Sequence, residues 1–195
     1  AQVALGASGA ADAAEREHAL KSLLAGCDRA TRLVEQLLAL ARVESAGLGA
    51  AAAPVELGAL ARRLLAELAP QAGAKGCELA LEAPAPLAVP GSEALLGALL
   101  RNLVDNALQH GGVRVDVTVD APARTLTVED AGPGLPPEAI ARLGERFFRA
   151  EGAADGGSGL GWSLVRRIAA LHRIGIAVDR SPALGGLRVV LRFAQ

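Results

Sequence analysis

The chain has 195 residues, enough for one ordinary domain with a small additional segment, and 51% of them are hydrophobic although only 2% are aromatic. Twenty basic residues against twenty-one acidic ones give a formal net charge of −1, which gives no electrostatic reason to expect nucleic acid or an anionic membrane surface as a partner. The two cysteines, Cys27 and Cys77, indicate neither a disulfide framework nor a metal cluster, which fits a reducing compartment, and each is most simply a small buried hydrophobe.

The first part of the chain, residues 1–45, has the pattern of a helical hairpin. After the break GASGAAD, a long helix is predicted over 13–44, with a seam in steps of four and three residues: Leu20, Leu24, Cys27, Thr31, Val34, Leu38 and Ala41. Such a heptad seam is typical of a coiled coil or helical bundle and needs a partner helix from this chain or from a second copy. The chain has no methionine and opens on AQVAL as if within a helix, so we expect it to be a piece of a longer protein.

The second part, residues 55–195, follows a linker of small residues over 46–54 and mixes helices with strands. The spacing predicts helices over 57–68, 92–109, 137–143 and 160–172, and strands over 78–82, 113–119, 125–130, 174–179 and 187–193. The turn signals DAPAR and SPALGG favour hairpins between neighbouring strands. This pattern predicts an α+β fold, a two-layer sandwich in which helices cover a mixed, mostly antiparallel sheet, preceded by the helical-bundle segment. No apolar run approaches the ~20 residues of a membrane-spanning helix, and no signal peptide is visible.

Two asparagines stand four residues apart in the otherwise apolar helix predicted over 92–109. Asn106 projects between Leu95 and Leu99, inside the apolar arc, and Asn102 lies at its edge. A buried amide without partners costs about 1–3 kcal/mol. Some group must therefore satisfy Asn106.

A carboxylate ends the strand in TLTVEDAGPG. Alternation places Asp130 on the same face as Leu126 and Val128, and Gly132 and Gly134 follow at once. A buried carboxylate must be paired or hydrogen-bonded, and a ligand amine would serve, with the glycines letting a flat ligand approach the backbone. The alternative is a strand that ends in a turn capped by Asp130.

The third motif is the glycine-rich stretch DGGSGLGWSLV before an apolar helix. Backbone N–H groups freed by Gly157, Gly159 and Gly161 at a positive helix end make a phosphate site, whereas the alternative is a flexible loop. Trp162 after Gly161 excludes a Walker loop, and Leu164 stands where a dinucleotide fingerprint needs its third glycine. The preceding segment FFRAEGAAD has the composition of a mobile lid.

The order of these motifs resembles the ATP-binding domain of sensor histidine kinases, a family related to gyrase, Hsp90 and MutL ATPases. The resemblance covers residues 55–193, and RATRLVEQLLALARVES is similar to the end of the second helix of the kinase dimerisation domain. It implies that Asn106 coordinates Mg²⁺ through its side-chain oxygen, that Asn102 orients phosphates or water, and that Asp130 accepts from the adenine amino group.

The same resemblance implies roles for the loops. Gly132 and Gly134 pass beside the base, and Arg149 approaches the terminal phosphate. The remaining positions implied for ATP binding are His110, Phe147, Gly157, Ser158, Gly159, Leu160 and Gly161.

Several positions depart from the family pattern. Gln109 replaces a lysine or arginine that touches phosphate in many members, and His110 is as compatible with helix-end packing as with a phosphate contact. Trp162 replaces a leucine, and its indole either hinders the lid or packs over it. His18 lacks the sequence context of a phosphoacceptor, and His172 has only an ordinary helix-end position, so we expect the phosphoacceptor histidine to be absent from the chain.

This resemblance implies the catalytic core of a two-component sensor histidine kinase, the cytoplasmic portion of an inner-membrane protein. The resemblance implies ATP, Mg²⁺, a response regulator and a second copy joined through the helical segment as partners, and no nucleic acid. One rival is a hydrolytic ATPase, which needs an acidic general base just before Asn106; Glu93 lies too far upstream and Arg101 occupies the neighbouring position. The other is a degenerate kinase-like dimerisation or interaction module without catalysis.

Overall fold

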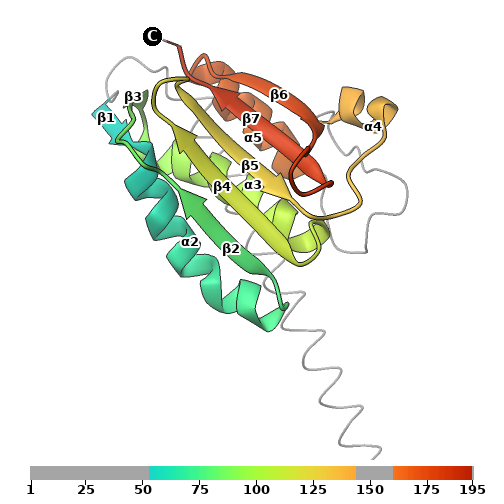
Figure 1. Cartoon of the computed structure of the whole chain (residues 1–195). Helices are drawn as coiled ribbons and strands as arrows, with labels where there is room; N and C mark the ends of the chain where they lie inside the picture. Colours follow the sequence, from blue (N-terminus) through green and yellow to red (C-terminus); the bar gives the residue numbers. More distant parts are fainter. Residues whose placement is uncertain (1–52, 144–159, 195) are drawn as a thin grey trace, which may run out of the picture. The chain divides into compact units, whose positions relative to one another are not determined.

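A five-stranded mixed sheet, covered on one face by three helices, dominates the residues that this computed structural model describes, 53–143 and 160–194 (Figure 1). All of them belong to the second of two compact units of the chain, Leu38–Gln195. The predicted helical segment 1–45 with its seam, His18 and Cys27, and the linker up to residue 52 lie outside the described residues.

The strand order places the three strands that contain buried residues at the centre of the sheet. Across the sheet the strands are β2 (Glu78–Glu82), β4 (Arg114–Asp120), β5 (Thr125–Asp130), β7 (Leu187–Arg192) and β6 (Gly175–Arg180). Only β2 and β4 run parallel, and the other neighbours are antiparallel. The hairpins predicted at DAPAR and SPALGG are confirmed as β4–β5 and β6–β7.

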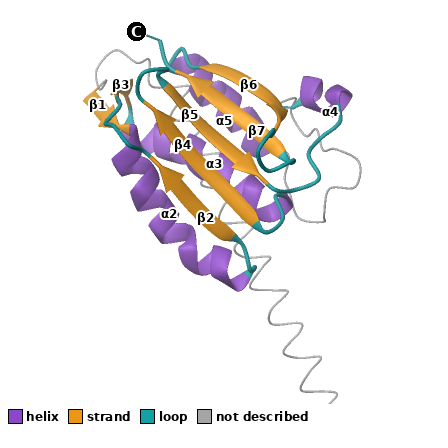
Figure 2. Cartoon of the chain, viewed as in Figure 1, coloured by secondary structure: helices purple, strands orange, loops and turns teal. Residues whose placement is uncertain are grey.

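The helices lie on one face of this sheet (Figure 2). They are α2 (Leu57–Ala74), α3 (Glu93–His110) and α5 (Leu160–Leu171), while the short α4 (Pro137–Arg142) follows β5. Helix α3 packs against both α2 and α5. The predicted two-layer α+β sandwich with a mixed, mostly antiparallel sheet is confirmed.

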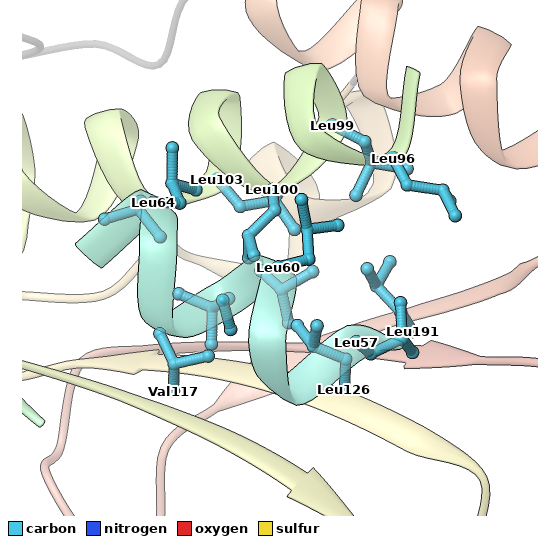
Figure 3. Close-up of a cluster of buried hydrophobic side chains, with 14 of the residues drawn as sticks. Leu57, Leu60, Leu64, Leu96, Leu99, Leu100, Leu103, Val117, Leu126 and Leu191 are labelled. Carbon is cyan, nitrogen blue, oxygen red and sulfur yellow. The ribbon is translucent and has the colours of Figure 1, made fainter. Parts of the chain in front are cut away.

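Alternation along the strands separates an apolar face from a polar one. In β4 the valines 115, 117 and 119 are buried, whereas Arg114, Asp116 and Thr118, which alternate with them, are half-buried on the opposite face. The helices bury their leucines against the apolar face; Figure 3 shows Leu57, Leu60, Leu64, Leu96, Leu99, Leu100, Leu103, Val117, Leu126 and Leu191 meeting there. Cys77 belongs to this core, as predicted, and burial raises the pKa of its thiol.

The sequence pattern does not predict two short strands or the last residues of one helix. Strands β1 (Ala53–Glu56) and β3 (Ala88–Gly91) form a separate antiparallel pair in which Pro54 lies opposite Pro90. Each strand has only four residues and contains a proline, so neither shows a clear alternation. Helix α2 continues beyond the predicted end at 68, through the exposed Pro70, and its last turns bury Ala72 in the core.

Glu56 caps α2, a role that the sequence pattern does not indicate. Its carboxylate accepts from the backbone N–H groups of Gly58 at 2.9 Å and of Ala59, and from that of Leu87 at 3.3 Å. Partial burial acts to raise the pKa of this carboxyl, but the backbone donors outweigh it and lower the pKa. The charged form is therefore the one that the folded state prefers.

Replacing this cap tests its contribution to stability. Glu56→Ala is expected to lower the free energy of unfolding by about 0.5–2 kcal/mol at pH 7, because N–H groups of the first turn lose their acceptor. Since the folded pKa is lowered, this contribution is present above the ordinary glutamate pKa of about 4.5 and is lost as pH falls through the folded value. Urea unfolding of wild type, Glu56→Ala and Glu56→Gln at pH 7 and below pH 4.5 measures it; a difference that does not shrink in acid would contradict the account.

His172 links two parts of the fold rather than merely ending a helix. Its Nε2 accepts from the N–H of Ser92 at 3.1 Å, and its Nδ1 lies 2.9 Å from the carbonyl oxygen of Ile168. Both bonds form only when the ring is neutral with its proton on Nδ1. A side-chain carbon at Gly91 would lie 2.8 Å from the His172 ring, so the absence of a side chain there lets the ring reach Ser92. The expectation of an ordinary helix-end residue misses this link.

None of the helices within the described ranges has both the length and the apolar character that a membrane span requires.

Candidate ATP-binding site

The two asparagines of α3 face the first turn of α5. Asn102 donates from Nδ2 to the carbonyl oxygen of Ala98 at 2.8 Å, which leaves its Oδ1 toward Gly161. A side-chain carbon at Gly161 would lie 3.0 Å from Asn102 Oδ1 and 3.8 Å from Asn106 Nδ2. The structure therefore brings together the asparagine pair and the last glycine of the glycine-rich stretch, more than fifty residues apart in the chain.

Asn106 carries an unsatisfied polar atom. The residue is half-buried, and its Nδ2 is the one fully buried side-chain nitrogen or oxygen among the described residues that has no hydrogen-bond partner. Leaving such a group unpaired costs about 1–3 kcal/mol. Turning the amide over would present its oxygen at the same place, so Asn106 suits either a hydrogen-bonding ligand or a metal ion that takes oxygen ligands.

The residues at this position fit a magnesium ion held together with phosphates. Among the residues that the structure describes, no group of three or more His, Cys, Asp or Glu side chains could hold a metal by itself. Mg²⁺ keeps several waters and takes one or two protein oxygens plus substrate phosphates. The side-chain oxygen of Asn106, once the amide is turned over, is a suitable hard ligand for that arrangement.

Asp130 ends β5 on the apolar face, as the alternation predicts. It is 8% exposed, and its Oδ1 accepts from the backbone N–H of Gly132 at 2.9 Å and of Leu187 at 3.1 Å. The bond to Gly132 confirms the simpler interpretation, that Asp130 caps the turn that follows it. The bond from Leu187 is a long-range contact that the sequence does not indicate.

Three glycines let the backbone close around Asp130. A side-chain carbon would lie 2.5 Å from Asp130 Cβ at Gly111, and 2.2 Å from Asp130 Oδ1 at Gly186. At Gly132 it would lie 2.4 Å from the carbonyl oxygen of His110. Gly132 thus has a role in packing the chain against itself, and Gly111 and Gly186 are site residues that the motif analysis missed. Gly134 has φ +73°, so the loop after β5 needs a glycine there.

The structure shows the surroundings of the residues that depart from the family pattern. Trp162 is half-buried and packs against the hydrophobic core, so its indole is accommodated at the start of α5. Gln109 and His110 are exposed in the last turn of α3. Arg101, at the position that argues against a hydrolytic base, forms a salt bridge with Glu67 of α2.

The remaining predicted site residues lie outside the described residues. These are Phe147, Arg149, Gly157, Ser158 and Gly159; of Leu160 the structure describes only the backbone, which begins α5. Their roles stay predictions. Among the described residues, the structure thus brings Asn102 and Asn106 together with Gly161, and Asp130 together with Gly132 at the end of α3.

Comparison with known protein families shows to which family this chain belongs. Residues 91–195, more than half of the chain, match the family described as "Histidine kinase-, DNA gyrase B-, and HSP90-like ATPase". The matched region contains every predicted site residue.

Sequence and structural relatives agree with this match. The chain is 40% identical over 185 residues to the sensor protein QseC of Salmonella typhi, covering 93% of this chain and 40% of that protein. The structure is similar to the cytoplasmic segment of histidine kinase QseC, with TM-score 0.62, 29% identity and coverage of 86% of this chain and 94% of that one. It is also similar to full-length ShkA in complex with AMPPNP, with TM-score 0.66, 30% identity and coverage of 84% and 35%.

The chain spans about 40% of the length of QseC, so it corresponds to one part of such a sensor protein. This chain belongs to the family of histidine kinase-, DNA gyrase B- and HSP90-like ATPases and carries the catalytic ATPase domain of a two-component sensor histidine kinase.

Proposed function

We propose that this chain binds Mg-ATP between α3, the start of α5 and the end of β5, and that it delivers the γ-phosphoryl group to a histidine, from which it passes to an aspartate of a response regulator. The observation that carries the proposal is the unsatisfied buried amide of Asn106 beside Gly161, on the helix whose end lies against the buried Asp130. ShkA, which is similar in structure, was crystallised with AMPPNP, an analogue of ATP.

The base end of the site is centred on Asp130. Its carboxylate accepts a hydrogen bond from the adenine amino group, and Gly132 and Gly134 let the base lie close to the backbone. Because Gly132 and Leu187 already hold Oδ1, the carboxylate is oriented before the nucleotide binds. Prior orientation of this kind reduces the entropy lost on binding.

The phosphate end lies along α3 and α5. Asn102 orients phosphates or water, and N–H groups of Gly157, Ser158, Gly159, Leu160 and Gly161 cradle the phosphates at the positive end of α5. Phe147 and Arg149 contribute from the segment before the glycine-rich stretch, with Arg149 contacting the terminal phosphate, and His110 contributes from the end of α3. Asn106 would hold Mg²⁺, which when bound neutralises charge on the phosphates.

The residues of this chain form no covalent bond to the transferred phosphoryl group. In the transfer, the bond between the γ-phosphorus and its bridging oxygen breaks, a phosphorus–nitrogen bond to histidine forms, and ADP leaves. The protein contributes positioning and neutralisation of charge, which are the main terms in phosphoryl transfer.

The accepting histidine is not one of the three in this chain. His172 uses both ring nitrogens in structural contacts, with Ser92 and Ile168. His110 lies at the site itself, at the end of α3, and His18 lacks the sequence context of a phosphoacceptor. We therefore infer that the phosphoacceptor belongs to the parent protein's dimerisation helices, that the parent dimerises through the heptad seam, and that it holds this domain on the cytoplasmic side of the inner membrane.

Binding of a fluorescent ATP analogue with and without Mg²⁺ tests the proposal. Wild type is expected to bind more tightly with Mg²⁺, and Asn106→Ala to lose this dependence, with affinity in Mg²⁺ reduced about tenfold or more. Gln71→Ala is the matched control, because it removes another half-buried side-chain amide, on α2, outside the site.

The outcomes separate the proposal from its rival. Failure of wild type to bind the nucleotide would overturn the kinase assignment and favour the interaction module without catalysis. Full Mg²⁺ dependence in Asn106→Ala would remove Asn106 from the metal site. A purified phosphoacceptor helix hairpin from a related kinase, incubated with the chain and radiolabelled ATP, then tests transfer to a separate histidine.

A further inference from the structure

We infer that Ser181, in the turn between β6 and β7 (residues 181–186), is a positioning residue for Asp130. The inference rests on the proposed function, since it assigns to Asp130 the recognition of the adenine amino group. No motif in the sequence marks Ser181; its turn is recognisable only as a hairpin connection.

Ser181 is unusually buried for a turn residue. It is 2% exposed, and it and Asp130 are the two polar or charged residues that are buried in the described part of the chain. Its hydroxyl donates to Glu129 Oε1 at 2.8 Å and accepts from the N–H of Leu184 at 2.9 Å. Ser181 therefore fixes the shape of its own turn and ties that turn to the residue before Asp130.

The other end of the turn holds Asp130 directly. The N–H of Gly186 donates to the Asp130 carbonyl oxygen at 3.1 Å, and that of Leu187 donates to its Oδ1 at 3.1 Å. Inside the turn, the N–H of Ser181 donates to the Gly186 carbonyl oxygen at 2.8 Å, and that of Gly185 donates to the Ser181 carbonyl oxygen at 3.0 Å. The turn is thus attached at Ser181 to Glu129 and at Gly186 and Leu187 to Asp130.

The close fit at Gly186 shows how little freedom this arrangement leaves. A side-chain carbon there would lie 2.2 Å from Asp130 Oδ1 and 2.3 Å from its carbonyl oxygen. Any shift of the turn therefore moves the donor of the Leu187 bond relative to the carboxylate. Losing the Ser181 hydroxyl frees the turn at its first attachment, so the Leu187 N–H holds the Asp130 carboxylate less firmly, while the bond from Gly132 remains.

The test compares ATP with purine riboside triphosphate, which lacks the amino group at position 6 of the base. Wild type is expected to prefer ATP. Ser181→Ala and Glu129→Ala are each expected to reduce ATP affinity about fivefold, because each removes the same hydrogen bond, and to leave the affinity for the deaminated analogue unchanged. Ser181→Thr, which keeps the hydroxyl, is expected to restore the preference.

Thr127→Ala is the matched control, because it removes a hydroxyl from β5 on the opposite face of the sheet from Asp130. Equal weakening of both nucleotides in Ser181→Ala and Glu129→Ala, or an intact ATP preference in both, would overturn the inference and leave the turn a purely structural element. Absence of ATP binding by wild type would instead refute the proposed function itself. Should Ser181→Ala fail to fold, Glu129→Ala still decides, because Glu129 is half-buried on the polar face.

Discussion

Asp130→Asn is expected to weaken ATP binding about 10- to 100-fold while the domain stays folded. The substitution replaces an acceptor that serves the adenine amino group by an amide whose N–H₂ can face that amine, and hydrogen bonds to charged groups contribute about 1.5–3 kcal/mol. One amide oxygen remains to accept from Gly132 and Leu187 as Oδ1 does now, so the turn keeps its contacts.

Titration of wild type and Asp130→Asn with the fluorescent ATP analogue measures this effect, and circular dichroism checks the fold. Purine riboside triphosphate should bind the two proteins alike, since it offers no amine to the position that was changed. Unaltered ATP affinity in a folded Asp130→Asn protein would show that the base binds elsewhere. The loss of ATP affinity in Asp130→Asn is expected with or without Mg²⁺, whereas the loss in Asn106→Ala is expected only when Mg²⁺ is present. The two variants therefore probe opposite ends of the proposed site.

Leu99→Ala should produce the largest loss of stability. Leu99 is 1% exposed and belongs to the cluster of buried side chains between the helices and the sheet (Figure 3). Truncating a buried leucine costs about 2–5 kcal/mol, a large part of the 5–15 kcal/mol by which domains of this kind are stable. The cost comes from the lost burial of apolar surface and from the cavity that remains.

Urea unfolding followed by circular dichroism measures this loss, with Leu95→Ala as control. Leu95 belongs to the same helix but is only half-buried, so its truncation should cost clearly less. Equal losses in the two variants would mean that the face of α3 assigned to the core is wrong. Nucleotide binding to any Leu99→Ala protein that remains folded then shows whether the site tolerates a loosened core.

The two halves of the base site have different origins. Asp130 is held by the turn that follows it in the chain, through Gly132, and also by a turn more than fifty residues away, through Leu187. The first contact is local and follows from the sequence DAG. The second exists only because β5 and β7 are neighbours in the sheet.

The sequence by itself determined most of the secondary structure and the order of the motifs. Alternation fixed β2 and β5, and it placed Asp130 on the apolar face, because each depends on side chains that are close along the chain. The same is true of the helical spacing that set Asn102 and Asn106 one turn apart. Periodicity is a local property, so no tertiary information is needed to recognise it.

Only the tertiary structure decided how these pieces meet. The pairing of β1 with β3, the bonds of His172 to Ser92 and of Ser181 to Glu129, and the packing of Trp162 on the core all join residues distant in sequence. Such contacts depend on strand order and helix placement. Sequences with the same periodicity can adopt different strand orders, so periodicity does not predict these contacts. A polar residue such as Ser181 therefore looks like an ordinary turn residue until the neighbouring strand shows what it holds.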